Sequence, residues 1–107
     1  MSRQRRSHAA AFAALGHATR LSLVAKLSNG RPHSIAQLTG GFKLSRQAIT
    51  KHLRVLEGAG IVHGVRAGRQ SLFALDPQPI KEIQEYLDLV SRQWDGALAR
   101  LKAFVED

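Results

Sequence analysis

Apolar residues recur at helical spacing through the first part of the chain, in short segments that end at glycine. The spacing predicts a first helix over residues 7–15, where Phe12 and Leu15 share a face, and a second helix over residues 18–28. Four residues of the second helix are expected to face inward: Leu21, Val24, Ala25 and Leu27. A third, short helix is predicted over residues 34–39. Its buried residues are expected to be Ile35 and Leu38.

The segment from Ser45 to Leu56 predicts a fourth helix with two different faces. Ser45 is well placed as its N-cap, and Gly58 and Gly60 end it. One face is apolar and carries Ala48, Ile49, Leu53 and Leu56. The opposite face carries Arg46, Gln47, Thr50, Lys51 and Arg54. Side chains of these types reach guanine edges, adenine edges and phosphates when a helix lies in the major groove of DNA.

A turn at residues 40–44 joins this helix to the short helix before it, so the pair has a helix-turn-helix layout. Beyond the pair, residues 61–66 and 69–75 are rich in β-forming side chains. They predict a β-hairpin with Gly68 at its tip.

A long helix is predicted over residues 79–105, after Pro77 and Pro79 end the hairpin. Apolar residues recur along it at steps of three and four: Ile80, Ile83, Leu87, Val90, Trp94, Ala97, Leu101 and Phe104. A small domain cannot bury this much apolar surface by itself, so we expect a second copy of the chain to cover it. The alternative, that the stripe only covers the domain's own core, stays open. The residues expected at the dimer interface are Phe12, Ile83, Leu87, Val90, Trp94, Ala97 and Leu101.

Positive charge is concentrated before the last predicted helix. No Asp or Glu precedes Glu57, whereas ten Lys or Arg residues do. Residues 1–75 carry twelve basic residues and one acidic residue, a net charge of +11, and residues 76–107 carry four basic and seven acidic residues, a net charge of −3, which together give the +8 of the chain. A polyanion is the natural partner of such a field, because each neutralised phosphate releases condensed counterions. We therefore expect double-stranded DNA as the partner, with a merely solubilising basic surface as the alternative.

Three segments resemble the ArsR/SmtB-type winged helix-turn-helix repressors of bacteria. The segment Ala14-Leu15-Gly16-His17-Ala18-Thr19-Arg20-Leu21 is similar to the start of that family's second helix, residues 44–56 to its recognition helix, and Ala59-Gly60-Ile61-Val62 to the start of its wing. Many members have an acidic N-cap and a proline where this chain has His17-Ala18. The resemblance covers about residues 12–100.

The resemblance implies a fold class that is mainly α with a β-hairpin wing (α+β), in a single winged helix-turn-helix domain over residues 1–107. It also implies a homodimeric repressor that binds a double-stranded, inverted-repeat operator, and it leaves an unknown small-molecule effector open. Residues 1–6 are expected to form a disordered basic arm, which leaves a further phosphate contact open.

The position of each polar residue predicts its role at the DNA. Arg46 and Gln47 lie in the first turn of the recognition helix and are expected to read base edges, with a solvated helix surface as the alternative. Thr50, Lys51 and Arg54 lie farther along and are expected to bind phosphates, and Thr50 is also placed to touch a base.

The remaining candidates lie at the end of this face and on the wing. His52 is expected either to donate to a phosphate or to pack against the wing. Arg66 and Arg69 flank the hairpin tip, where a wing meets the adjacent minor groove, although basic hairpin tips also serve solubility. The full set expected at the DNA is Ser45, Arg46, Gln47, Thr50, Lys51, His52, Arg54, Arg66 and Arg69.

Metal, cofactor and enzyme chemistry find little support in the sequence. The chain has no cysteine, and its last histidine, His63, falls in the predicted wing. Glu85, Asp88 and Asp95 alone are a poor ligand set for a zinc-like ion, so we expect no metal and no cofactor. No glycine-rich phosphate loop, cysteine nucleophile or paired carboxylate is recognisable, so we expect no enzymatic activity.

No apolar run approaches the roughly 18 residues of a membrane span, and the basic start lacks the apolar core of an export signal. A cytoplasmic protein without membrane contact is expected. Two further functions stay open besides the DNA-binding regulator. One is a winged-helix architectural or protein- or RNA-binding module. The other is a metal-responsive repressor with a ligand set that the pattern does not reveal.

Overall fold

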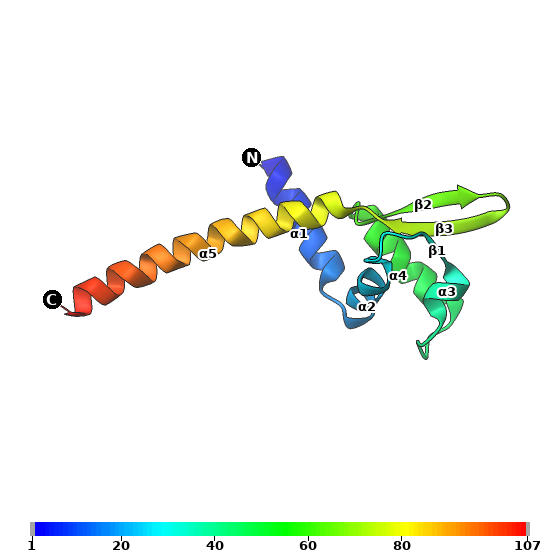
Figure 1. Ribbon diagram of the computed structural model, residues 1–107, viewed down its shortest axis with the longest axis horizontal. Helices are drawn as coiled ribbons and strands as arrows, with labels where there is room; N and C mark the ends of the chain where they lie inside the picture. Colours follow the sequence, from blue (N-terminus) through cyan, green and yellow to red (C-terminus); the bar gives the residue numbers. More distant parts are fainter. Residues whose placement is uncertain (1, 107) are drawn as a thin grey trace.

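The computed structural model describes the backbone of residues 2–106 and the side chains of residues 8–106. Five helices and three strands follow one another along these residues. In chain order they are α1 (Ser2–Leu15), α2 (Ala18–Leu27), β1 (His33–Ser34), α3 (Ile35–Thr39), α4 (Arg46–Gly58), β2 (Val62–Ala67), β3 (Gln70–Leu75) and α5 (Pro77–Glu106). The expected winged helix-turn-helix layout is confirmed: α3 and α4 form the helix pair, and β2 and β3 form the wing (Figure 1).

Side-chain caps fix where the helix pair begins. The Ser45 hydroxyl accepts a hydrogen bond from the backbone N–H of Ala48, 3.1 Å away, so the predicted N-cap of α4 is confirmed. Ser34 and Gln37 form a reciprocal capping box at the start of α3, in which each side chain accepts from the other residue's backbone N–H. Such caps satisfy backbone donors that the first turn of a helix leaves unpaired.

The end of α4 depends on Gly60. This glycine has a φ of +76°, a left-handed conformation that residues with a Cβ rarely adopt. The N–H of Gly60 donates to the carbonyl of Glu57, and the N–H of Ile61 donates to the carbonyl of Leu56. This pair of bonds is the Schellman motif, and it turns the chain from the recognition helix directly into the wing.

The strands form a small antiparallel sheet in the order β1-β3-β2. Ala67 pairs with Gln70, so Gly68 and Arg69 form a two-residue turn. Gly68 has a φ of +61°, as the first central residue of a type II′ hairpin turn requires. The two-residue strand β1 is not expected from the sequence. It pairs with β3 and ties the wing to the segment before α3.

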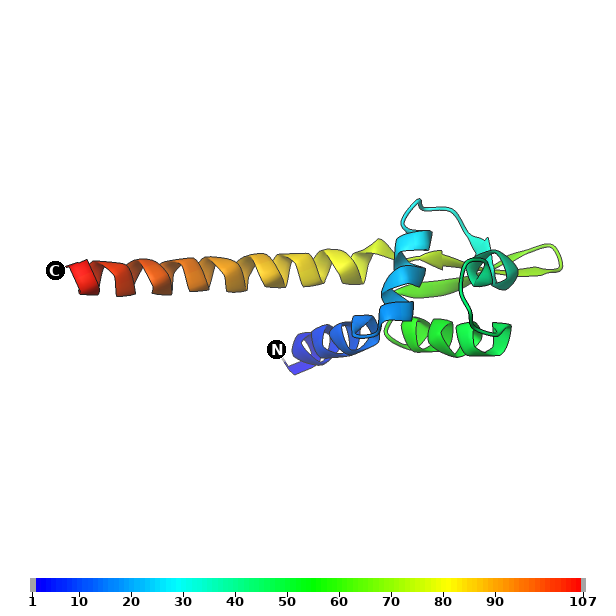
Figure 2. The same cartoon turned by 90° about the horizontal axis from the view of Figure 1, so that it is seen from below.

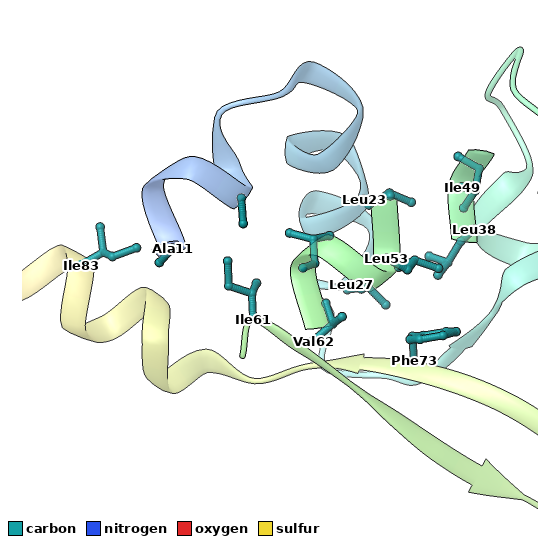
Figure 3. Close-up of a cluster of buried hydrophobic side chains, with 12 residues drawn as sticks. Ala11, Leu23, Leu27, Leu38, Ile49, Leu53, Ile61, Val62, Phe73 and Ile83 are labelled. Atoms are coloured by element: carbon teal, nitrogen blue, oxygen red, sulfur yellow. The ribbon is translucent and has the colours of Figure 1, made fainter. Parts of the chain in front are cut away.

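One hydrophobic core joins the helices to the base of the wing. Its buried members are Ala11, Ala14, Leu23, Leu27, Leu38, Ile49, Leu53, Leu56, Ile61, Val62, Phe73 and Ile83. Figure 3 shows side chains from α2, α4 and the hairpin pointing toward one another in this cluster. The apolar face of α4 supplies three members that are fully buried, Ile49, Leu53 and Leu56.

The long helix α5 leaves this core after its first turns. It packs beside α1 and then extends away from the rest of the domain, opposite the wing (Figures 1 and 2). The molecule therefore measures 68 × 30 × 22 Å. Asp76 caps the helix, because its side chain accepts from the N–H of Gln78, and Pro77 occupies the first helical position, two residues before the predicted start.

Two expectations about the N-terminal helices are wrong. The inward face of α2 is formed by Leu23 and Leu27, with Val24 partly buried, whereas Leu21 is 53% exposed and Ala25 is also exposed. Helical spacing alone permits both faces, and the packing of α2 against α4 and β3 selects this one.

The expected disordered arm is helical from Ser2 onward. No Pro or Gly interrupts the chain before Gly16, so α1 can propagate back through residues that form helices well. Met1 lies outside the described residues.

The core packing of α4 predicts a clear difference between two neighbouring aliphatic residues. Leu53 is fully buried, whereas Val55, in the same helix, is 45% exposed. Leu53→Ala should lower the free energy of unfolding by about 2–5 kcal/mol because it leaves a cavity. Val55→Ala should change it by less than about 0.5 kcal/mol. Urea denaturation at one fixed protein concentration measures both values, and equal losses would contradict the described orientation of α4.

Candidate nucleic-acid interface

The candidate interface is the side of α4 that faces away from the core. Arg46, Gln47 and Lys51 are exposed there, and Ser45 is exposed at the helix start. Thr50 is half-buried, and its hydroxyl donates to the backbone carbonyl of Arg46 at 2.7 Å. The surface therefore presents two long cations and an amide from one face of a rigidly anchored helix.

A residue of α3 adds to this surface. Ile35, its first residue, is only partly buried against the core. Together with Arg46, Gln47 and Thr50 it lines an open hollow of ≈ 380 Å³. The sequence pattern indicates only a core role for Ile35, since an aliphatic residue at a helix start carries no signal for DNA contact.

Arg54 has two partners within the chain. Its Nη1 lies 2.8 Å from Oε1 of Glu57, and its guanidinium lies 5.7 Å from the centre of the Phe73 ring. The Arg54 and Glu57 side chains are 61% and 36% exposed, so the ion pair is a surface pair worth at most about 1 kcal/mol. These contacts hold Arg54 against the wing base in the free protein, and its role as a phosphate anchor stays a prediction.

His52 lies against the start of α2. Its ring centre is 4.5 Å from that of His17, and its Nδ1 is 3.3 Å from Nη1 of Arg20. The expectation that His52 packs against the wing is therefore wrong, because its position on α4 turns it to the flank that meets α2. Its contact with phosphate stays a prediction.

This cluster explains the unusual start of α2. His17 takes the place of an acidic N-cap: its Nδ1 accepts from the backbone N–H of Thr19 at 3.1 Å. Arg20 binds the carbonyls of Ala13 and Ala14 at the end of α1. Burial lowers the pKa of His52 below its ordinary value of 6.5, and the charges of His17 and Arg20 lower this pKa further.

The wing carries the two expected arginines at its far end. Arg66 and Arg69 are exposed and flank the Gly68 turn. Figures 1 and 2 show the hairpin projecting beyond α3 and α4.

Glu57 is the only carboxylate in the first 75 residues, and Arg54 pairs with it. The surface around α4 and the wing is therefore strongly cationic.

The expected dimer residues differ in how accessible they are. Ile83 is only 6% exposed and belongs to the protomer's own core, since α5 packs on α1 at this point. Ile83 is therefore assigned to the protomer's core and not to the expected dimer interface. Val90 and Ala97 are half-buried. The others are at least 38% exposed: Phe12, Leu87, Trp94 and Leu101.

The described residues contain no group of three or more His, Cys, Asp or Glu side chains that could hold a metal ion. In the same part of the chain no helix has the length and apolarity needed to cross a membrane.

The chain is similar to known transcriptional regulators. Residues 15–65 match a family model described as a helix-turn-helix domain. The HTH-type transcriptional regulator Rv2034 of Mycobacterium tuberculosis is 34% identical over 93 residues, which cover 87% of this chain and 83% of the relative.

Two solved structures are also similar. An ArsR-like transcriptional regulator from Rhodococcus sp. RHA1 superposes with a TM-score of 0.82 at 30% identity, over 94% of this chain and 93% of that one. The transcriptional repressor BigR from Xylella fastidiosa superposes with a TM-score of 0.63 at 26% identity, over 85% of this chain and 90% of that one. The similarity thus extends over the helix pair, the wing and most of the terminal helices.

The environment of His52 predicts a loss of stability in acid. Because the folded state lowers the pKa of His52, the unfolded chain binds a proton first as the pH falls through 6.5. Stability should therefore be fully present above about pH 6.5 and should decrease below it. His52→Asn, which keeps an acceptor for Arg20 but does not titrate, should reduce this decrease.

Thermal unfolding between about pH 7.5 and about pH 5 measures the effect. The matched control is His63→Gln on β2, where the histidine is exposed, and it should keep the pH dependence of the unchanged protein. An identical decrease in His52→Asn would contradict the lowered pKa of His52 in the folded protein.

Proposed function

Because the chain belongs to the ArsR-type winged helix-turn-helix transcriptional regulators, we propose that it represses transcription as a homodimer bound to an inverted-repeat operator. One observation carries the proposal: α4 buries Ile49, Leu53 and Leu56 while Arg46, Gln47 and Lys51 remain exposed on the same helix. A helix held in this way can enter a major groove as a rigid body.

The first turn of α4 is proposed to read sequence. Arginine forms bidentate hydrogen bonds with guanine and glutamine does so with adenine. Arg46 and Gln47 have the required exposure at the helix start. Lys51 lies more than a turn farther along and suits a phosphate, which contributes affinity without discrimination.

The wing is proposed to bind beside α4. Arg66 and Arg69 are exposed at its tip, and a narrow minor groove attracts arginine through its negative potential. The positive φ of Gly68 permits a two-residue connection between β2 and β3, and the wing tip is therefore narrow.

The dimer is proposed to form through α5 and α1. Trp94 is 64% exposed and Leu101 is 59% exposed, and they lie one heptad apart on the heptad-like stripe, with Ala97 between them. Farther toward the core, Phe12 of α1 contacts Tyr86 of α5 with ring centres 6.3 Å apart, and both remain exposed. Contiguous apolar surface of this kind marks interaction sites, and a second copy with the same stripe fits it by two-fold symmetry.

This function assigns the chain no catalytic step and places its action in the cytoplasm, beside the DNA that it binds. The direct test is footprinting of the purified protein on the DNA upstream of its own gene. Protection of an inverted repeat overlapping the promoter supports repression by occlusion. Uniform weak binding along the fragment would contradict the proposed sequence specificity.

The two groups of residues on α4 should behave differently when truncated. Arg46→Ala or Gln47→Ala should cost about 1–3 kcal/mol on the operator and much less on random DNA, because each removes a base contact. Lys51→Ala should weaken binding to both DNAs and reduce the salt slope by about one unit. Fluorescence anisotropy titrations with both duplexes at several salt concentrations make this comparison. Equal losses on both DNAs for all three variants would contradict the assignment of base readout.

Trp94 should be an anchor of the dimer. Aromatic residues at interface centres often cost at least about 2 kcal/mol when truncated, so Trp94→Ala should shift the protein toward monomer in sedimentation at low micromolar concentration. Operator affinity should fall with it, since a monomer presents only one recognition helix. Glu82→Ala, an exposed change near the start of α5, serves as the control. A folded Trp94→Ala protein that stays fully dimeric would place the interface elsewhere.

A further inference from the structure

The hollow between α3 and α4 lies within the proposed base-reading surface. Ile35, Arg46, Gln47 and Thr50 line its ≈ 380 Å³. Arg46 and Gln47 offer polar ends suited to base edges, whereas Ile35 offers an aliphatic side chain. An apolar side chain thus lines the same hollow as two side chains suited to hydrogen bonding.

The orientation of Thr50 makes the hollow more apolar than its composition indicates. Its hydroxyl donates to the backbone carbonyl of Arg46, one turn earlier in α4, at 2.7 Å. Threonine in a helix commonly adopts this conformation. Because the hydroxyl is bonded to the backbone, the methyl is the group of Thr50 that remains to face the hollow.

Ile35 is held firmly on the other side. It directly follows the N-cap of α3, and the reciprocal bonds between Ser34 and Gln37 define that helix start. Lys26 of α2 donates to the carbonyls of Leu38 and Gly40 at the other end of α3. The two walls of the hollow therefore belong to elements that are separately anchored, so the hollow is already formed in the free protein.

The major groove has one apolar group that distinguishes a base, the C5 methyl of thymine. We infer that the hollow accepts a thymine C5 methyl group, packed between Ile35 and the Thr50 methyl, beside the bases read by Arg46 and Gln47. This inference rests on the proposed function, because α4 must enter the major groove. It makes Ile35 and Thr50 specificity-determining residues and predicts a thymine at a fixed position in each half-site.

The experiment begins with selection of duplexes from a random pool by the purified protein. In the selected duplex each thymine is then replaced in turn by deoxyuridine, which pairs identically and lacks only the methyl. In each half-site, replacement of one particular thymine should weaken binding. Each such single replacement should cost about fourfold, the value for removing one methyl from an apolar contact. The other replacements should have little effect.

Two variants of Thr50 separate the methyl from the hydroxyl. Thr50→Ser removes the methyl from both protomers of the dimer, so it should lose about this factor at each half-site of the thymine duplex and show no further loss with deoxyuridine. Thr50→Val, which keeps a methyl at this place, should retain the preference for thymine. Thermal unfolding checks that both variants are folded. The reverse order, in which Thr50→Val binds weakly and Thr50→Ser binds normally, would assign the readout to the hydroxyl and overturn the inference.

The outcomes separate the inference from the function on which it rests. If no duplex is enriched from the pool, the proposed sequence-specific binding fails and the inference fails with it. If a duplex is enriched but every deoxyuridine substitution is neutral, the protein is still a specific DNA-binding regulator, and only the thymine-methyl contact is refuted.

Discussion

The burial of one face of α4 is the constraint on which the rest of the structure depends. Ile49, Leu53 and Leu56 fix the rotation of this helix about its axis, since each has no exposed surface in the protomer. Full burial of an aliphatic side chain contributes about 1.5–3 kcal/mol, so a rotation that exposed these residues would be costly. Arg46, Gln47 and Lys51, which are exposed on the opposite face, thereby acquire fixed directions through the helix that carries them.

The core also sets the position of the wing relative to α4. The Schellman motif at Gly60 leads from the helix into β2 within a few residues, and Ile61 and Val62 are buried immediately after it. Phe73 of β3 packs in the same core. Helix and wing therefore share one core, which suits a protein that contacts a groove and the neighbouring backbone together.

Much of this arrangement is visible in the sequence, for identifiable reasons. The cap at Ser45, the apolar face of α4 and the hairpin turn at Gly68 depend on local spacing and on residues with special backbone properties, and all three are confirmed. The inward face of α2 is not predictable in the same way, because Leu21 and Leu23 are both aliphatic and only packing against α4 and β3 distinguishes them. The contact of His17 and Arg20 with His52 joins residues more than 30 positions apart, which no local pattern indicates. The same holds for Ile35, whose neighbours in the hollow come from a different helix.

Together, α4 and the wing tip are proposed to form the DNA-binding surface. Backbone amide chemical shifts measured by NMR, without and with the selected operator duplex, test it most directly. The largest shift changes should fall in residues 45–51 and 66–69, while the amides at the far end of α5 should be unaffected. Changes confined to α1 and α5, with the amides of α4 unperturbed, would contradict it.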